Sequence, residues 1–154
     1  MSRISVQVPL RWADMDAYGH VNNVNQVRLM EEARVMAFGS PSGTGEPVNR
    51  AGKIALFESV GSEILILVVD HHIRYVAQLP YRDIPIRVEL WVEKIKGASF
   101  ELHYEFFDGH TGQLASRAST TMALTDLDGK ILRLTPELKA GLAQFTDEKD
   151  DDAA

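Results

Sequence analysis

Apolar and polar residues alternate at the start of the chain. From Ile4 to Trp12 an apolar side chain stands at every second position, which predicts a half-buried strand over these residues. The segment from Val24 to Phe38 instead repeats its apolar residues at helical spacing. Its apolar arc is unusually wide, because Leu29 and Met36 extend it. We therefore expect this helix to be wrapped by other elements rather than to lie on a surface.

The second half of the chain predicts four more strands, at residues 64–76, 84–92, 100–106 and 114–125. Asp108-Gly109 and Asp128-Gly129 predict turns on either side of the last strand. Two short helices are also expected. One covers Ile54 to Val60, and the other begins after Thr135, which would cap it with Pro136 in its first turn.

Long strands joined by tight turns are antiparallel neighbours, since parallel strands need a crossover connection. The chain has one strand, one long buried helix and then four strands. An antiparallel sheet curled around one central helix is the simplest way to bury that helix. This order predicts the α+β class.

Composition places the chain among ordinary globular proteins. Its 154 residues are 45% hydrophobic and 25% charged, enough for one domain with a sizeable core. There is no apolar run long enough to span a membrane, and the opening strand pattern leaves no room for a signal peptide, so a cytoplasmic location is expected. The lack of cysteine excludes disulfides, thiol nucleophiles and cysteine-based metal sites.

The net charge of −6 is concentrated at the C-terminus. Residues 147–152 carry five acidic side chains and one lysine, which leaves a charge of only −2 on the rest of the chain. The tail, residues 147–154, has no apolar periodicity and is expected to be disordered, after a single domain over residues 1–146. A nearly neutral body without a basic stripe argues against nucleic-acid binding.

The most unusual stretch is RWADMDAYGHVNN, residues 11–23, between the first strand and the helix. One interpretation is a turn in which Asp and Asn side chains cap the backbone. A second interpretation is catalytic. A carboxylate just before a helix can face the free N–H groups at the helix N-terminus. Such a pair offers a base or nucleophile and an oxyanion hole, and hydrolysis by it needs neither cysteine nor metal.

The motif D-M-D-A-Y-G-H-V-N-N, followed by R-x-x-E-E-A-R, resembles the hot-dog-fold acyl-CoA thioesterases of the 4-hydroxybenzoyl-CoA thioesterase type. H-x-I-x-Y at residues 71–75 and A-S-F at residues 98–100 add weaker similarity. The resemblance implies a curved antiparallel sheet of about five strands around a long helix, assembled into homodimers or homotetramers. It also implies hydrolysis of an acyl-CoA to a free acid and CoA, with no metal or redox cofactor.

Carried over residue by residue, the family's catalytic carboxylate falls on Asp16, as general base or nucleophile. Asp14 matches a neighbour that is often acidic. The backbone N–H that polarises the thioester carbonyl falls at Asn23, while Gly19 and His20 shape the turn. The residues do not decide between a covalent and a general-base route.

The resemblance also suggests where the nucleotide part of CoA binds. Lys96 and Ser99, with Lys94 behind them, are the candidate CoA-binding residues before the A-S-F strand. In the helix, Asn23 and Gln26 have the spacing of a capping box, so Gln26 is expected to cap the helix rather than face an acyl pocket. Glu31 and Arg34 are expected to form a structural pair.

Other functions stay open. The same fold could bind acyl-CoA without catalysis, or act on acyl-carrier protein instead of CoA. A hot-dog dehydratase is a weaker alternative, because its G-D-x-N-P-x-H-like segment is missing. Asp70 and His72 share a strand face but have no identifiable third ligand, so no metal site is predicted.

Overall fold

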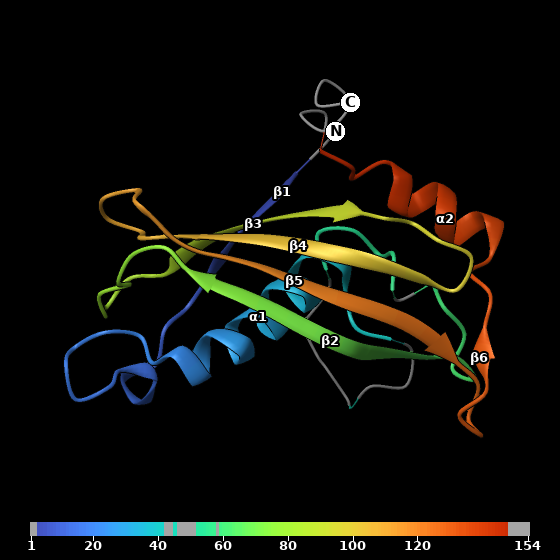
Figure 1. Ribbon diagram of the computed structural model, residues 1–154, viewed down its shortest axis with the longest axis horizontal. Helices are drawn as coiled ribbons and strands as arrows, with labels where there is room; N and C mark the ends of the chain where they lie inside the picture. The colour runs from blue at the N-terminus through green and yellow to red at the C-terminus, as the bar shows by residue number, and fades with distance from the viewer. Residues whose placement is uncertain (1–2, 42–44, 46–51, 58, 148–154) are drawn as a thin grey trace.

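The computed structural model describes residues 3–41, 45, 52–57 and 59–147 (Figure 1). Within these ranges the elements follow one another as β1 (Ile4–Val8), η1 (Trp12–Asp14), α1 (Asn23–Phe38), β2 (Leu65–Tyr75), β3 (Ile86–Glu93), β4 (Ser99–Phe107), β5 (Leu114–Thr125), β6 (Ile131–Leu132) and α2 (Pro136–Ala143). Except at the first strand and the residue 54–60 segment, the predicted elements match these to within about two residues.

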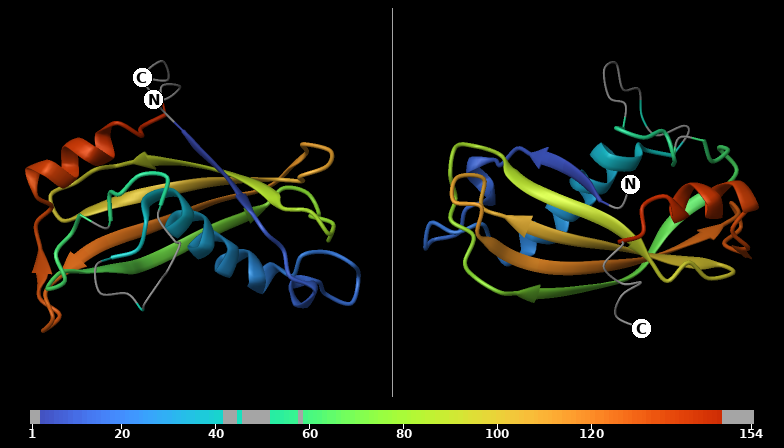
Figure 2. Two further views of the ribbon diagram at one scale, coloured as in Figure 1. Left: turned by 180° about the vertical axis from the view of Figure 1, so that it is seen from behind. Right: turned by 90° about the horizontal axis from the view of Figure 1, so that it is seen from above.

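The strands form one antiparallel sheet in the order β1-β3-β4-β5-β2, and the short β6 pairs with β5. Figures 1 and 2 show the sheet curving along α1, while α2 lies at the end of the sheet where β3 finishes. This arrangement confirms the α+β class and the hot-dog architecture expected from the sequence. The edge strands β1 and β2 each pair with one strand, β3 and β5, and have no strand neighbour on the outer side among the described residues.

The core lies between α1 and the concave face of the sheet. Five apolar side chains of α1 are fully buried: Leu29, Met30, Ala33, Ala37 and Phe38. They pack in one cluster with the inward-facing side chains of β3, β4 and β5. The predicted burial of the helix is therefore confirmed. Its buried side also includes two polar residues, Gln26 and Arg34.

The first strand is shorter than the alternation predicted. It ends at Val8, before Pro9, and proline has no N–H to donate to a strand ladder. Trp12 lies in η1 and its side chain is 75% exposed, although it continues the apolar alternation. The prediction of a strand reaching Trp12 was wrong, because the alternation of apolar residues continues beyond Val8, where the hydrogen-bonded pairing with β3 ends.

The predicted helix from Ile54 to Val60 is also wrong. The described residues of this segment form turns. Their amides bond instead to the end of α1: Ile54 donates to the carbonyl of Ala37 at 3.0 Å, and Phe57 to that of Phe38 at 2.9 Å. The segment thereby satisfies carbonyl groups that a helix C-terminus leaves free, and it buries Leu56, Phe57 and Val60.

The C-terminal helix follows the prediction. The Thr135 hydroxyl accepts the N–H of Leu138, and Pro136 occupies the first turn of α2. Beyond it, Asp147 forms an ion pair with Arg3 at 2.6 Å. Residues 148–154, most of the tail predicted to be disordered, lie outside the described residues, as do 42–44 and 46–51 of the Gly- and Pro-rich loop. Among the described residues, no helix has the length and apolar character to cross a bilayer.

Candidate active site

Asp14 anchors the loop between β1 and α1. Its side chain is completely buried, and it accepts hydrogen bonds from the Arg11 amide at 2.7 Å and from Arg28 of α1 at 2.7 and 2.9 Å. Burial alone would raise the pKa of Asp14, but these hydrogen bonds outweigh burial and hold the pKa below its ordinary value. Asp14 is thus a fixed, fully engaged anion with a structural role.

Asp16, two residues later, has a different environment. Its side chain is half-buried, and Oδ1 accepts the amides of Tyr18 at 2.8 Å and His20 at 3.1 Å. Gly19 closes this turn with a φ of +77°, a conformation that L-residues with side chains rarely adopt. The described residues give Oδ2 of Asp16 no hydrogen-bond donor. The turn fixes the carboxylate through one oxygen and leaves the other for a water or a substrate.

The N-terminus of α1 follows directly. Asn22, not Asn23, is the N-cap, and its side chain accepts the Val24 amide at 3.0 Å. The predicted capping box at Asn23 and Gln26 is therefore wrong by one residue. Asn23 is the first helical residue, and within the described part of the chain its own N–H has no acceptor. A free N–H at a helix N-terminus is a suitable donor to a developing oxyanion.

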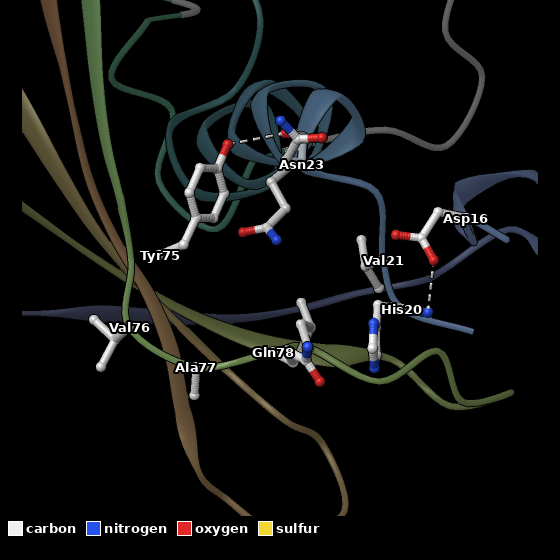
Figure 3. Close-up of a pocket in the computed structure, with 10 residues that line it drawn as sticks. Asp16, His20, Val21, Asn23, Tyr75, Val76, Ala77 and Gln78 are labelled. Carbon is white, nitrogen blue, oxygen red and sulfur yellow. Dashed lines mark hydrogen bonds between the residues drawn. The ribbon is translucent and has the colours of Figure 1, made fainter. Parts of the chain in front are cut away.

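These groups meet at one cavity of about 380 Å³, drawn in Figure 3. Asp16, His20 and Asn23 line it from the loop and the helix, and β2 and the segment after it supply the opposite wall with Tyr75 and Gln78. The structure thus brings together three of the four predicted catalytic residues, and Gly19 shapes their turn. Tyr75 also joins the two walls, because its hydroxyl donates to the carbonyl of Asn23 at 3.3 Å.

Gln26 lines the same cavity, contrary to the prediction that it caps the helix. Its side chain is only 4% exposed, and its Oε1 accepts the Ser116 hydroxyl of β5 at 2.6 Å. Sequence reasoning missed this role because the partner lies ninety positions away in the chain. The signal available in the sequence was the position of Gln26 within an otherwise apolar arc of the helix.

The predicted CoA-binding residues lie elsewhere. Lys94 and Lys96 lie in the β3–β4 turn and Ser99 begins β4, and Figure 1 shows this turn at the opposite end of the sheet from the loop that carries Asp16. Lys94 is paired with Glu101 at 3.1 Å, while Lys96 is exposed. One copy of the chain does not bring these residues to the cavity.

Comparison with known proteins identifies the family to which the chain belongs. The model of the thioesterase-like superfamily matches residues 10–145, which include the loop, α1 and the whole sheet from β2 onward. The chain belongs to the thioesterase-like superfamily. The general activity of this thioesterase is hydrolysis of a thioester. No curated protein sequence matches the chain.

Solved structures share the fold at low sequence identity. The DHNA-CoA thioesterase from Staphylococcus aureus is 22% identical, with a TM-score of 0.72 over 100% of this chain and 97% of that one. YbaW, a probable thioesterase from Escherichia coli, is also 22% identical, with a TM-score of 0.65 over 96% and 100% of the two chains. Slr0204, a 1,4-dihydroxy-2-naphthoyl-CoA thioesterase from Synechocystis, is 18% identical, with a TM-score of 0.65 over 92% and 95%.

One group of side chains in the described ranges has the spacing of metal ligands. Glu93, Glu101 and His103 lie together on the convex face of the sheet, with their ligand atoms within 4.8 Å of one another. They already pair among themselves, since Nε2 of His103 lies 2.8 Å from Glu101 and 3.2 Å from Glu93. This group is remote from Asp16. Near the cavity, His71 contacts Thr120 through Nδ1 at 2.9 Å.

Proposed function

We propose that this thioesterase hydrolyses an acyl-CoA to a free carboxylic acid and CoA, with Asp16 as general base or nucleophile. The observation that carries the proposal is the shared cavity of the Asp16 carboxylate and the free N–H of Asn23. One group can activate the attack, and the other can stabilise the negative charge that develops on the thioester oxygen.

Two routes fit this arrangement. In the first, Oδ2 of Asp16 removes a proton from water as the water oxygen bonds to the thioester carbon. In the second, Asp16 attacks that carbon itself and forms an anhydride, which water then hydrolyses. In both, the carbonyl oxygen becomes an oxyanion beside the Asn23 amide, and the C–S bond breaks to release CoA. Gly19 and His20 keep a supporting role, because their backbones form the turn that holds Asp16.

The assembly proposed for this function is a homodimer formed through β2. This edge strand of eleven residues pairs with β5 on one side and with no strand of the described ranges on the other, and it exposes Leu65, Leu67, Val68 and Val69. Long apolar edge strands pair readily with another strand. A second copy could also bring its own β3–β4 turn nearer the cavity, which is what binding of CoA by Lys96, Ser99 and Lys94 requires. A homotetramer, a cytoplasmic location and independence from metal or redox cofactors stay predictions.

The alternative is an acyl-CoA-binding protein without turnover. In its favour, Oδ1 of Asp16 already caps two amides, so the carboxylate has a structural reason to exist. A turn of this kind is equally well capped by asparagine, however, and binding alone has no use for the remaining free oxygen. Acyl-carrier protein is a second possible carrier of the same thioester.

Thiol release from a panel of thioesters tests the proposal. The panel contains short, long and aromatic acyl-CoAs, 1,4-dihydroxy-2-naphthoyl-CoA because two structural neighbours are named for it, and acyl-carrier-protein thioesters of matched chain length. The proposal predicts turnover of at least one acyl-CoA by the wild type and its loss in Asp16→Asn. Tight binding of an acyl-CoA without turnover would support the function as a binding protein. Turnover of carrier-protein thioesters and of no acyl-CoA would show that acyl-carrier protein, not CoA, carries the substrate.

A further inference from the structure

A second cavity lies between α1 and β2 and has a volume of about 760 Å³. It shares Asn23 and Tyr75 with the catalytic cavity and extends along α1 as far as Arg34. Eleven residues of helix separate Asn23 from Arg34, a rise of about 16 Å. An acyl group held at the Asn23 amide can therefore run along this groove, with its far end toward Arg34.

Arg34 is an unusual residue for the floor of an acyl groove. It is only 8% exposed, and its Nη1 atom has no hydrogen-bond partner among the described residues. Its Nη2 atom donates to Glu31 at 3.4 Å, but the Glu31 side chain is 68% exposed and the contact is long. A buried guanidinium with an unused donor is costly unless something supplies an acceptor.

Around Arg34 the described residues provide hydroxyl and imidazole groups, and Glu31 is the one carboxylate with which Arg34 forms an ion pair. The Tyr104 hydroxyl is fully buried beside Arg34 and Thr120, without a hydrogen bond of good geometry to either. His71 lies on the wall of the groove, and burial together with the Arg34 charge lowers its pKa, so its imidazole is neutral near pH 7. Arg34 is thus a buried cation whose ion pair in the described part of the chain is a long contact with the exposed Glu31 carboxylate.

We propose that Arg34 determines substrate specificity by binding an anionic oxygen, such as a carboxylate, at the far end of the acyl group. This inference rests on the proposed thioesterase function and names its substrate class: acyl thioesters with a distal carboxylate. A carboxylate in this groove would accept hydrogen bonds from the Arg34 guanidinium, which lines it. A plain hydrocarbon chain would leave Nη1 of Arg34 unpaired, and a site built for a hydrogen bond rejects analogues that cannot form it.

Matched substrates test the inference. Suberoyl-CoA and octanoyl-CoA have eight-carbon acyl groups and differ by a terminal carboxylate, and pairs of six and ten carbons cover shorter and longer reach. We expect the wild type to favour the carboxylated member of at least one pair by about tenfold or more in kcat/KM. Arg34→Gln should abolish that preference, with the larger loss of kcat/KM on the carboxylated member of the pair. Arg74→Gln, which neutralises an exposed arginine of β2, is the matched control and should keep the preference.

Because Arg34 is buried, Arg34→Lys provides a second variant that keeps the charge but not the planar donor pair. It should retain part of the preference. Equal rates on both members of every wild-type pair, or an Arg34→Gln variant that loses both activities equally, would overturn the inference and leave the thioesterase function standing. An Arg34→Gln variant in which only the oligomeric state changes would also overturn the inference, because Arg34 would then contribute to a subunit interface.

A binding measurement separates this inference from the proposed function. S-octyl-CoA and S-(7-carboxyheptyl)-CoA are thioethers that no thioesterase can hydrolyse. By calorimetry, the carboxylated analogue should bind the wild type at least about tenfold more tightly, and Arg34→Gln should remove the difference. If no thioester is hydrolysed but this result holds, the proposed function fails and the specificity of the groove stands. If both analogues bind equally or neither binds, the inference fails.

Discussion

Arg28 of α1 donates two hydrogen bonds to the buried carboxylate of Asp14, at 2.7 and 2.9 Å. This pair ties the loop before the helix to the helix itself. As a result, Asp16 and the Asn23 amide are held at the same cavity. The two aspartates of one short motif have different tasks, since the first fixes the loop and the second is the proposed catalytic group.

Replacing Asp14 should therefore cost stability. Asp14→Asn removes the charge that pairs with Arg28, whose side chain is 30% exposed, and should lower the free energy of unfolding by about 2 to 3 kcal/mol. Urea denaturation at pH 7 measures this loss. The matched variant Asp16→Asn should lose less than about 1 kcal/mol, because an asparagine oxygen can still accept the same two amides. Equal losses in the two variants would contradict the division of roles.

Gln26 and Ser116 should be energetically coupled. Ser116→Ala leaves Oε1 of the buried Gln26 without its donor, at a cost of about 1 to 2 kcal/mol. Gln26→Met removes the acceptor and keeps a similar shape. The double variant should be less destabilised than the sum of the single variants by at least about 0.5 kcal/mol in a double-mutant cycle. Simple additivity would show that the hydrogen bond contributes nothing measurable.

Asp108 should give the protein an acid-sensitive contribution to stability. Arg82 lies 3.0 Å from its carboxylate, which also accepts the His110 amide at 2.8 Å, and the pKa of Asp108 falls from 3.8 to about 2. Because the pKa of Asp108 is lower in the folded chain than in the unfolded chain, its carboxylate stabilises the fold at pH values above about 4. This contribution is lost as the pH falls from about 4 to 2. Asp108→Asn should thus show a shallower loss of unfolding free energy than wild type in this window. Parallel pH profiles would contradict this assignment.

The exposed edge of β2 should mediate dimerisation. Leu67 and Val69 are 44% and 61% exposed. The double variant Leu67→Lys/Val69→Lys places charge on this edge and should lower the dimer fraction at least about tenfold at equal concentration, as measured by light scattering after size exclusion. Leu127→Lys, at a comparably exposed leucine in the turn after β5, is the control and should leave the assembly unchanged. A monomeric wild type, or a dimeric double variant, would exclude β2 as the interface.

The fold was predictable because its signals are local. The alternation of β3, β4 and β5 and the wide apolar arc of α1 each follow from residues close in sequence, and the short turns allow only antiparallel pairing. The exceptions also have local causes. Pro9 ends a ladder that the alternation seemed to continue, and residues 54–57 use their amides on the end of α1 rather than on a helix of their own.

The site was predictable only in part. Asp16, His20 and Asn23 of the motif line one cavity, but the roles of Gln26 and Arg34 depend on what α1 meets in the folded protein. Gln26 is satisfied by Ser116 from β5, and Arg34 lies against Tyr104 of β4. No periodicity in the helix reveals such distant partners. The same limit applies to Lys96, because a single chain leaves the β3–β4 turn that carries it at the far end of the sheet from Asp16 (Figure 1).

The most direct measurement is kcat for Asp16→Asn on the best acyl-CoA substrate, beside wild type and Asp83→Asn, which alters an exposed aspartate outside the cavity. Removing a positioned base or nucleophile while keeping the turn should lower kcat by about 100-fold or more, with an unchanged unfolding midpoint and wild-type activity in Asp83→Asn. An Asp16→Asn variant that folds normally and keeps kcat within about threefold of wild type would show that Asp16 only caps its loop.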